Sequence, residues 1–369
     1  MDDFFDMNAD LFEETIESQL LLQIDADSEN RFLEKIGGEN ARERDLVAFV
    51  DQYAATGITM LCFPLCNEKY LPVWLDRCRK VGLKCALTVS CEQAETTALY
   101  ADLQTDAIIV DGRGIADFSC LPALPEKFPH GHFILLTDNT DVADADAYDT
   151  VIVCAEKRNC CKSGSELWLA KKENCCVLTA VCNYLCNEND TDWYPTPEIL
   201  NGFAVSVLAK GFDGIYLDGF CADPFDADSA LYDIFDTCGN LSDAVGARRR
   251  HLYDGDLPVE LQAGADMIVP MTLGPVFEGA AVCVLVGTDH EDAVSVFVND
   301  KETEKTGIPA IVARNAKGRE YENTCISKTV KCAEFFAPHD ELQDVVNVRI
   351  HNNTNKTIFL SWFEVTVNI

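Results

Sequence analysis

The sequence predicts an α/β chain in which a (β/α)8 TIM-type barrel is followed by an all-β sandwich domain. Eight short apolar runs alternate with helix-like or polar segments between residues 20 and 225, and the pattern changes after residue 256. At 369 residues and 48% hydrophobic composition, the chain is long enough for two domains with buried cores. We therefore expect an N-terminal extension over 1–19, a barrel domain over 20–255 and a β-sandwich domain over 256–369.

Each of the eight runs is a nearly continuous stretch of aliphatic residues, which is typical of strands covered on both faces. A doubly wound open sheet is the alternative fold. Its candidate glycine-rich turn, "GRGIAD" at 112–117, lacks the third glycine of a dinucleotide site, so the barrel is favoured and no cofactor is expected. The predicted strands are 20–25, 57–65, 83–90, 106–112, 132–138, 150–155, 176–183 and 214–219.

Two of the intervening segments carry clear helix signals. In "ERDLVAFVDQYAATG" (43–57), five residues share one face, and Gly57 follows as a stop. In "TPEILNGFAVSVLAKG" (196–211), Thr196 is a good N-cap, Pro197 fits the first helical position and Gly211 ends the helix. The apolar faces are Leu46, Phe49, Val50, Tyr53 and Ala54 in the first helix, and Leu200, Phe203, Val207 and Leu208 in the second.

After residue 256 the apolar runs are joined by turn-rich loops. The runs lie at 281–287, 293–300 and 345–352, and the last, "TIFLSWFEVTVNI", spans 357–369. Within it, apolar and polar residues alternate, which predicts a half-buried antiparallel strand in a sandwich. The apolar positions are Phe363, Val365, Val367 and Ile369, and the polar ones are Glu364, Thr366 and Asn368.

The charge and cysteine content exclude several classes of function. A formal net charge of −33 repels nucleic acid and anionic membranes, so neither is expected as a partner. The N-terminus carries no basic and apolar export signal, and no apolar run approaches the length of a membrane span, so a cytoplasmic protein is expected. Seven of the 18 cysteines lie between residues 154 and 186. Since no CxxC pair is present, reduced thiols are favoured over a metal site.

A set of segments in a fixed order gives the chain a family resemblance. They are "FVDQYAATGIT" (49–59), "VWLDRCRKVGLKCALTVS" (73–90), "TPEILNGFAVSVLAKGFDGIYLDGF" (196–220), "LYDIFDTCGNLSDAVGARRRHLY" (231–253) and "LPVELQAGADMIVP" (257–270). The chain thus resembles a family of uncharacterised bacterial glycoside-hydrolase-like proteins, which implies a (β/α)8 barrel followed by a C-terminal β-sandwich. The chain departs from the family's strand-end motifs at "IIVDGRG", "VSCE" and "DGF", and no catalytic residue is carried over.

Polar residues at the C-terminal ends of the predicted strands are the candidates for a site, because (β/α)8 barrels carry their chemistry there. Glycoside hydrolysis needs two carboxyl groups, one of them protonated. Asp111 and Asp218 end strands on opposite sides of the mouth, which favours the wide spacing of an inverting hydrolase. Arg113 would keep Asp111 ionised as the base and leave Asp218 as the acid. The substrate-binding candidates are Asp25, Asp27, Asn67, Glu92, Arg113, Asp138, Asn183, Trp193 and Tyr194.

Each of these residues also has a structural interpretation. Asp218 could cap the turn that follows it, and Asp111 with Arg113 could be a structural pair. The basic run "RRRH" (248–251) favours a salt-bridge network at the domain junction over a phosphate site. The hypothesis is therefore a glycoside-hydrolase-like protein acting on a small glycan or glycoside. The alternative is a non-catalytic carbohydrate-binding or assembly protein, and a homo-oligomer is left open.

Overall fold

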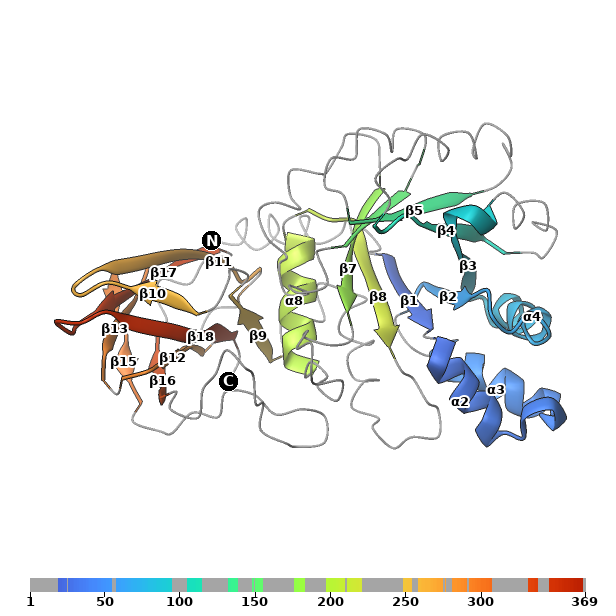
Figure 1. The fold of residues 1–369 in the computed structure, drawn as a ribbon, viewed down its shortest axis with the longest axis horizontal. Coiled ribbons are helices and arrows are strands. Elements are labelled where there is room, and N and C mark those ends of the chain that lie inside the picture. Colours follow the sequence, from blue (N-terminus) through green and yellow to red (C-terminus); the bar gives the residue numbers. More distant parts are fainter. Residues whose placement is uncertain are drawn as a thin grey trace, which may run out of the picture.

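Figure 1 shows the computed structural model of the chain. The structure describes residues 19–24, 26–54, 58–94, 105–114, 132–138, 148, 150–154, 176–182, 197–209, 211–220, 248–253, 258–274, 276, 281–290, 292–306, 331–337 and 345–367. The N-terminal extension predicted over 1–19 lies almost entirely outside these residues.

Parallel strands β1 to β8 pair in sequence order, and β8 pairs with β1 to close a barrel (Figure 1). Each strand coincides with one of the predicted apolar runs. Alternate residues point inward and form a core of their own, which includes Leu21, Ile109 and Tyr216, so the barrel interior is filled by side chains. The strands are β1 (Gln19–Ile24), β2 (Met60–Pro64), β3 (Lys84–Ser90), β4 (Ala107–Asp111), β5 (Phe133–Thr137), β6 (Thr150–Val153), β7 (Cys176–Cys182) and β8 (Gly214–Phe220).

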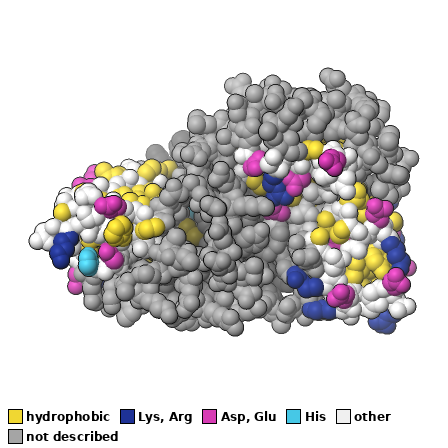
Figure 2. All heavy atoms as spheres, in the orientation of Figure 1, with side chains coloured by type: hydrophobic (Ala, Val, Ile, Leu, Met, Phe, Trp, Pro, Cys, Tyr) yellow, Lys and Arg dark blue, Asp and Glu magenta, His cyan; other side chains and the backbone are white. Residues whose placement is uncertain are grey.

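Three helices cover the strands at the start of the barrel: α2 (Ala26–Lys35), α3 (Glu43–Ala54) and α4 (Leu71–Val81). A short 3-10 helix, η1 (Gly38–Asn40), links α2 to α3. For α3, the predicted helix and its buried face are confirmed, except that Ala54 is exposed, while the predicted stop at Gly57 lies outside the described residues. Trp74 of α4 stacks on Phe63 of β2 with ring centroids 5.7 Å apart and planes at 8°. Acidic and basic side chains lie interspersed over these helices on the face seen in Figure 2. No helix among the described residues has the length and apolar composition needed to span a membrane.

Helix α8 (Pro197–Ala209) begins and ends as predicted, but it is not a surface helix with a single apolar stripe. It lies between the barrel strands and strand β9 (Arg249–Leu252), as Figure 1 shows. Polar residues such as Asn201 and Ser206 are therefore buried together with the apolar ones. The Ser206 hydroxyl donates to the carbonyl of Thr272 at 2.7 Å and lies 2.8 Å from Nδ1 of His251. These contacts join the barrel to the β-rich part of the chain.

The C-terminal part forms two antiparallel sheets that share one apolar core, as the sequence predicts. One sheet has the order β10, β18, β12, β16 and β15, with β9 also paired to β18, and the other has the order β11, β17, β13 and β14. The strands are β10 (Val259–Leu261), β11 (Asp266–Thr272), β12 (Val282–Thr288), β13 (Val294–Val298), β14 (Lys301–Glu302), β15 (Glu304–Lys305), β16 (Lys331–Phe336), β17 (Val345–Asn352) and β18 (Ile358–Val367).

Strand β18 is buried on both faces, so the prediction of a half-buried strand was wrong. Glu364 is 2% exposed and receives two hydrogen bonds from the Arg250 guanidinium, at 2.9 and 2.6 Å. The Trp362 indole N–H donates to the same carboxylate at 2.9 Å. The polar face of β18 can be buried because β9 supplies the positive charge that its carboxylate needs. The "RRRH" run thus contributes a salt bridge, as favoured from the sequence, while Asn368 and Ile369 lie outside the described residues.

Gly202 marks the closest approach between α8 and β9. A Cβ atom there would lie 2.3 Å from the backbone oxygen of Arg250, so only glycine fits without moving the backbone. We expect Gly202→Ala to lower the free energy of unfolding by about 1–3 kcal/mol through overpacking. Chemical denaturation would measure the loss. Ala209→Ser, which adds one atom at an exposed position of the same helix, should change it by less than about 0.5 kcal/mol, and an equal effect of both changes would contradict the packing argument.

Candidate functional site

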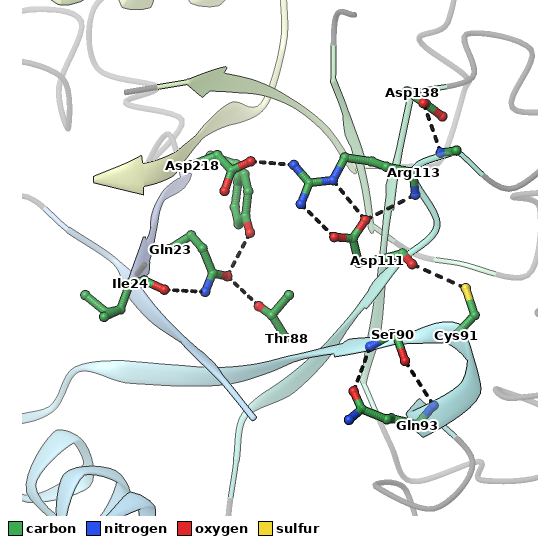
Figure 3. A network of polar contacts seen from close by, with 12 residues as sticks. Gln23, Ile24, Thr88, Ser90, Cys91, Gln93, Asp111, Arg113, Asp138 and Asp218 are labelled. Carbon is green, nitrogen blue, oxygen red and sulfur yellow. Dashed lines mark hydrogen bonds and ion pairs between the residues drawn. The ribbon is translucent and has the colours of Figure 1, made fainter. Parts of the chain in front are cut away.

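Two carboxylates and one guanidinium meet at the C-terminal mouth of the barrel (Figure 3). Arg113 donates to Asp111 through Nε, at 2.9 Å from Oδ1, and through Nη2, at 2.6 Å from Oδ2. Its third nitrogen, Nη1, lies 2.5 Å from Oδ2 of Asp218 on β8. The structure therefore brings together three residues that the sequence predicted for the site.

The shared guanidinium limits how far apart the two carboxylates are. Its terminal nitrogens are held about 2.3 Å apart by covalent geometry, and they contact Asp111 and Asp218 at 2.6 and 2.5 Å. The nearest carboxylate oxygens are thus no more than roughly 7.5 Å apart. That limit admits the separations of retaining hydrolases and the lower part of the inverting range, about 6.5–9.5 Å. The two carboxylates are therefore close enough to act on one bond, although their strands lie on opposite sides of the mouth.

The turn after β4 places Arg113. Asp111 Oδ1 accepts a hydrogen bond from the backbone N–H of Arg113 at 3.1 Å, which closes an Asx-type turn. Gly114 follows with φ of 75°, and its N–H donates to Asp138 Oδ2 at 3.0 Å. Burial lowers the pKa of Arg113, but its hydrogen bonds to Asp111 and the charges of Asp218 and Asp111 outweigh that effect and raise the pKa above its ordinary value.

A buried hydrogen-bond network lies beneath Asp218 inside the barrel (Figure 3). The side-chain oxygen of Gln23 accepts from Thr88 Oγ1 at 2.5 Å and from the Tyr216 hydroxyl at 2.8 Å. Burial, reinforced by the charge of Asp218, raises the pKa of Tyr216 well above its ordinary value, so the phenol stays neutral. Sequence reasoning missed this network. The one signal was a glutamine within the otherwise apolar run "LLLQI".

A second polar cluster joins α2 to the turn after β2. Cys66 Sγ lies 3.4 Å from Glu29 Oε2, and Asn67 Nδ2 lies 3.4 Å from the same sulfur and 3.0 Å from Asn30 Oδ1. Glu29 is fully buried, and this burial raises its pKa to about 7. No local motif marks Glu29 in the sequence. A carboxyl group in this state exchanges its proton near neutral pH.

The other predicted residues are distributed around the mouth or lie outside the described part. Asp138 is exposed beside the turn that holds Arg113, Asn67 belongs to the Glu29 cluster, and Glu92 is exposed after β3. Asp27 lies in α2, but its side chain is not among those described. Within the described ranges, no group of three or more His, Cys, Asp and Glu side chains is arranged to hold a metal. Asp25, Asn183, Trp193, Tyr194 and most of the cysteines between 154 and 186 lie outside the described residues.

No protein-family model and no curated protein matches the sequence. Several solved structures are similar in fold. An uncharacterised protein from B. cereus has 12% identity and a TM-score of 0.42, with 91% of this chain and 93% of that chain covered. An α-amylase from Malbranchea cinnamomea has 12% identity and a TM-score of 0.42, covering 73% and 90%. A family 123 glycoside hydrolase from Clostridium perfringens has 9% identity and a TM-score of 0.38, covering 55% and 49%. Similarities at this level do not assign a function.

Removing Arg113 should expose the repulsion between the two carboxylates. A fully buried pair that loses one partner costs about 3–5 kcal/mol, and the Arg113 side chain is 30% exposed. We therefore expect Arg113→Met to lower the free energy of unfolding by roughly 1–3 kcal/mol at pH 7, and by less at pH 4, where carboxylates take up protons. Adding Asp218→Asn should restore part of the loss. Denaturant titrations would measure the free energy of unfolding of both variants, with the exposed Arg44→Met as the control. If the effects of Arg113→Met and Asp218→Asn simply add in the double variant, the bridging role of Arg113 is contradicted.

The buried Glu29 carboxyl should make stability depend on pH. Because its pKa in the folded state, about 7, exceeds the ordinary value of 4.5, its contribution is present at low pH and lost as the pH rises through 7. Glu29→Gln keeps the shape but does not titrate, so at pH 8 it should stabilise the fold by on the order of 3 kcal/mol. At pH 4 the change should be small. Melting temperatures of Glu29→Gln would be compared at pH 4 and pH 8 with those of the control Glu34→Gln, which changes an exposed carboxylate. If the two variants show the same change in melting temperature between the two pH values, the role of Glu29 is contradicted.

Proposed function

We propose that this chain is a glycoside-hydrolase-like protein that binds a small glycan or glycoside at the barrel mouth and acts on it through Asp111 and Asp218. The observation that supports the proposal is the convergence of two carboxylates, from β4 and β8, on one guanidinium at the C-terminal end of the barrel strands. Barrel enzymes carry their active sites at this end of the fold, and paired carboxyl groups are the requirement for cleaving a glycosidic bond.

The contacts of the two carboxylates support different roles for them in this proposal. Asp111 is held by two hydrogen bonds from Arg113 and one from the backbone, which orients it as the base or nucleophile. The acid must carry a proton, and an ion pair requires a carboxylate. Asp218 can therefore serve as the acid only after its contact with Arg113 is broken. Ligand binding would have to move the guanidinium away from Asp218 while its contact with Asp111 remains.

A non-catalytic carbohydrate-binding or assembly protein is the second candidate, and one observation favours it. Arg113 is bonded to both carboxylates at once, so neither of them is placed as a proton donor. In such a protein the Asp111, Arg113 and Asp218 side chains would bind sugar hydroxyls as fixed donors and acceptors.

The remaining features of the proposal follow from the sequence. The net charge of −33 supports a protein that avoids nucleic acid and anionic membranes. The domain division at residue 256, a cytoplasmic location and the absence of a cofactor belong to the same proposal, and a homo-oligomer remains open.

A hydrolysis screen against oligosaccharides and aryl glycosides tests the proposal. The purified chain would be compared with Asp111→Asn and Asp218→Asn, which keep the size of each side chain but remove its charge. If the two carboxylates do the chemistry, each substitution should reduce turnover by at least about 100-fold. Glu68→Gln, at an exposed carboxylate in the turn after β2 that is not a site candidate, is the matched control and should leave turnover unchanged.

The possible outcomes separate the two candidates. Turnover that survives both substitutions would refute the assignment of Asp111 and Asp218. An absence of turnover, combined with saturable binding of a sugar in calorimetry that Arg113→Met abolishes, would favour the binding protein. Neither turnover nor binding would contradict both.

A further inference from the structure

Among the seven cysteines whose side chains the structure describes, Cys66 is the exposed one. Five others, at positions 62, 78, 85, 154 and 283, are buried, and Cys91 is partly buried. Cys66 follows the end of β2 by two residues and so lies at the same end of the barrel as Asp111 and Asp218. Its position at the mouth makes it accessible to a ligand, whereas the buried thiols serve as small apolar side chains.

Glu29 lies behind this thiol and is not used by the site around Arg113. One of its oxygens, Oε2, lies 3.4 Å from Cys66 Sγ. The other, Oε1, is buried and has no hydrogen-bond partner among the described residues. An unsatisfied carboxylate oxygen in a fully buried side chain is costly to keep for stability alone. A buried carboxyl group with an unsatisfied oxygen takes up a proton more readily than an exposed one.

The two groups have the protonation states that a nucleophile and its base require. Burial, followed by the charge of Glu29, raises the pKa of Cys66 to about 12, so the thiol is protonated at rest. Glu29, with a pKa of about 7, is half ionised at neutral pH and can accept that proton during attack. The groups that face Glu29 are the Cys66 thiol and the Asn67 amide. Glu68 and Lys69, on the same turn, are exposed to solvent.

We propose that Cys66 and Glu29 form a nucleophile and general-base pair that reacts with the carbonyl carbon of a small acyl ligand. The Cys66 sulfur forms a bond to the carbonyl carbon, and the S–H proton passes to Glu29. The bond between carbon and the leaving group then breaks, and the leaving group departs with the electron pair and takes the proton from Glu29. The product is a thioester on Cys66. Asn67 Nδ2, 3.4 Å from the sulfur, is placed to donate to the carbonyl oxygen as negative charge develops.

Acylation by p-nitrophenyl acetate tests the pair without reference to the proposed glycan chemistry. Release of p-nitrophenol would be followed at its isosbestic wavelength, and the acetylated residue would be identified by peptide mass spectrometry. The wild-type rate constant at Cys66 should rise between pH 6 and 8 with a midpoint near 7, as Glu29 loses its proton. Glu29→Gln should lower the rate constant at pH 8 on the order of 100-fold.

Matched variants distinguish a base from a mere neighbouring charge. Glu68→Gln removes an exposed carboxylate from the same turn and should leave the rate unchanged, while Cys66→Ser should abolish the label at this site. If Glu29 only suppresses the thiolate by its charge, Glu29→Gln will react faster than the wild type, which would overturn the proposal. The pH profile of the wild-type protein provides a test that does not depend on the folding of Glu29→Gln. An acylation rate that keeps rising well above pH 8, without a midpoint near 7, would overturn the proposal. Labelling confined to other cysteines would do the same.

Discussion

Closure of the barrel between β8 and β1 is the constraint on which the mouth depends. The two strands approach so closely that a Cβ at Gly214 would lie 2.0 Å from the backbone oxygen of Gln19. Because glycine allows this contact, β8 joins β1 in parallel register and the ring closes. Closure then fixes the end of β8 across the mouth from β4. Only in that arrangement can Arg113, on the turn after β4, reach Asp218 while it holds Asp111.

The barrel mouth places carboxyl groups in two opposite electrostatic environments. Asp111 and Asp218 share a guanidinium, which compensates one of their two charges. Among the described residues, Glu29 contacts a thiol and an amide, and burial has the largest effect on its pKa, which it raises to about 7. A site that must both bind ionised groups and transfer protons needs both environments. Both environments lie at the C-terminal end of the barrel strands, the first at β4 and β8 and the second after β1 and β2.

The sequence predicted the strands well, because buried parallel strands leave continuous apolar runs that are visible without any alignment. It also predicted that Asp111, Arg113 and Asp218 belong to one site, because strand order alone places strand ends at one mouth. It could not predict that Arg113 bridges both carboxylates, since that depends on a side-chain path across the barrel. Nor could it identify Glu29, because its altered pKa comes from burial in the folded state. The burial of the polar face of β18 was missed because it depends on Arg250, which comes from the neighbouring strand β9, a strand too short and too basic to be recognised.

The sheet that contains β9 and β18 is also connected to the site, through α8. The ion pair of Arg250 with Glu364 is almost fully buried, and the desolvation cost of such pairs offsets much of their attraction. Here the pair aligns β9 with β18, and β9 packs against α8 where Gly202 has no side chain. Helix α8 leads within five residues into β8, which carries Asp218. The β-rich part of the chain is thus linked, through the packing of β9 on α8 and the short connection from α8 to β8, to the strand that carries one of the two carboxylates.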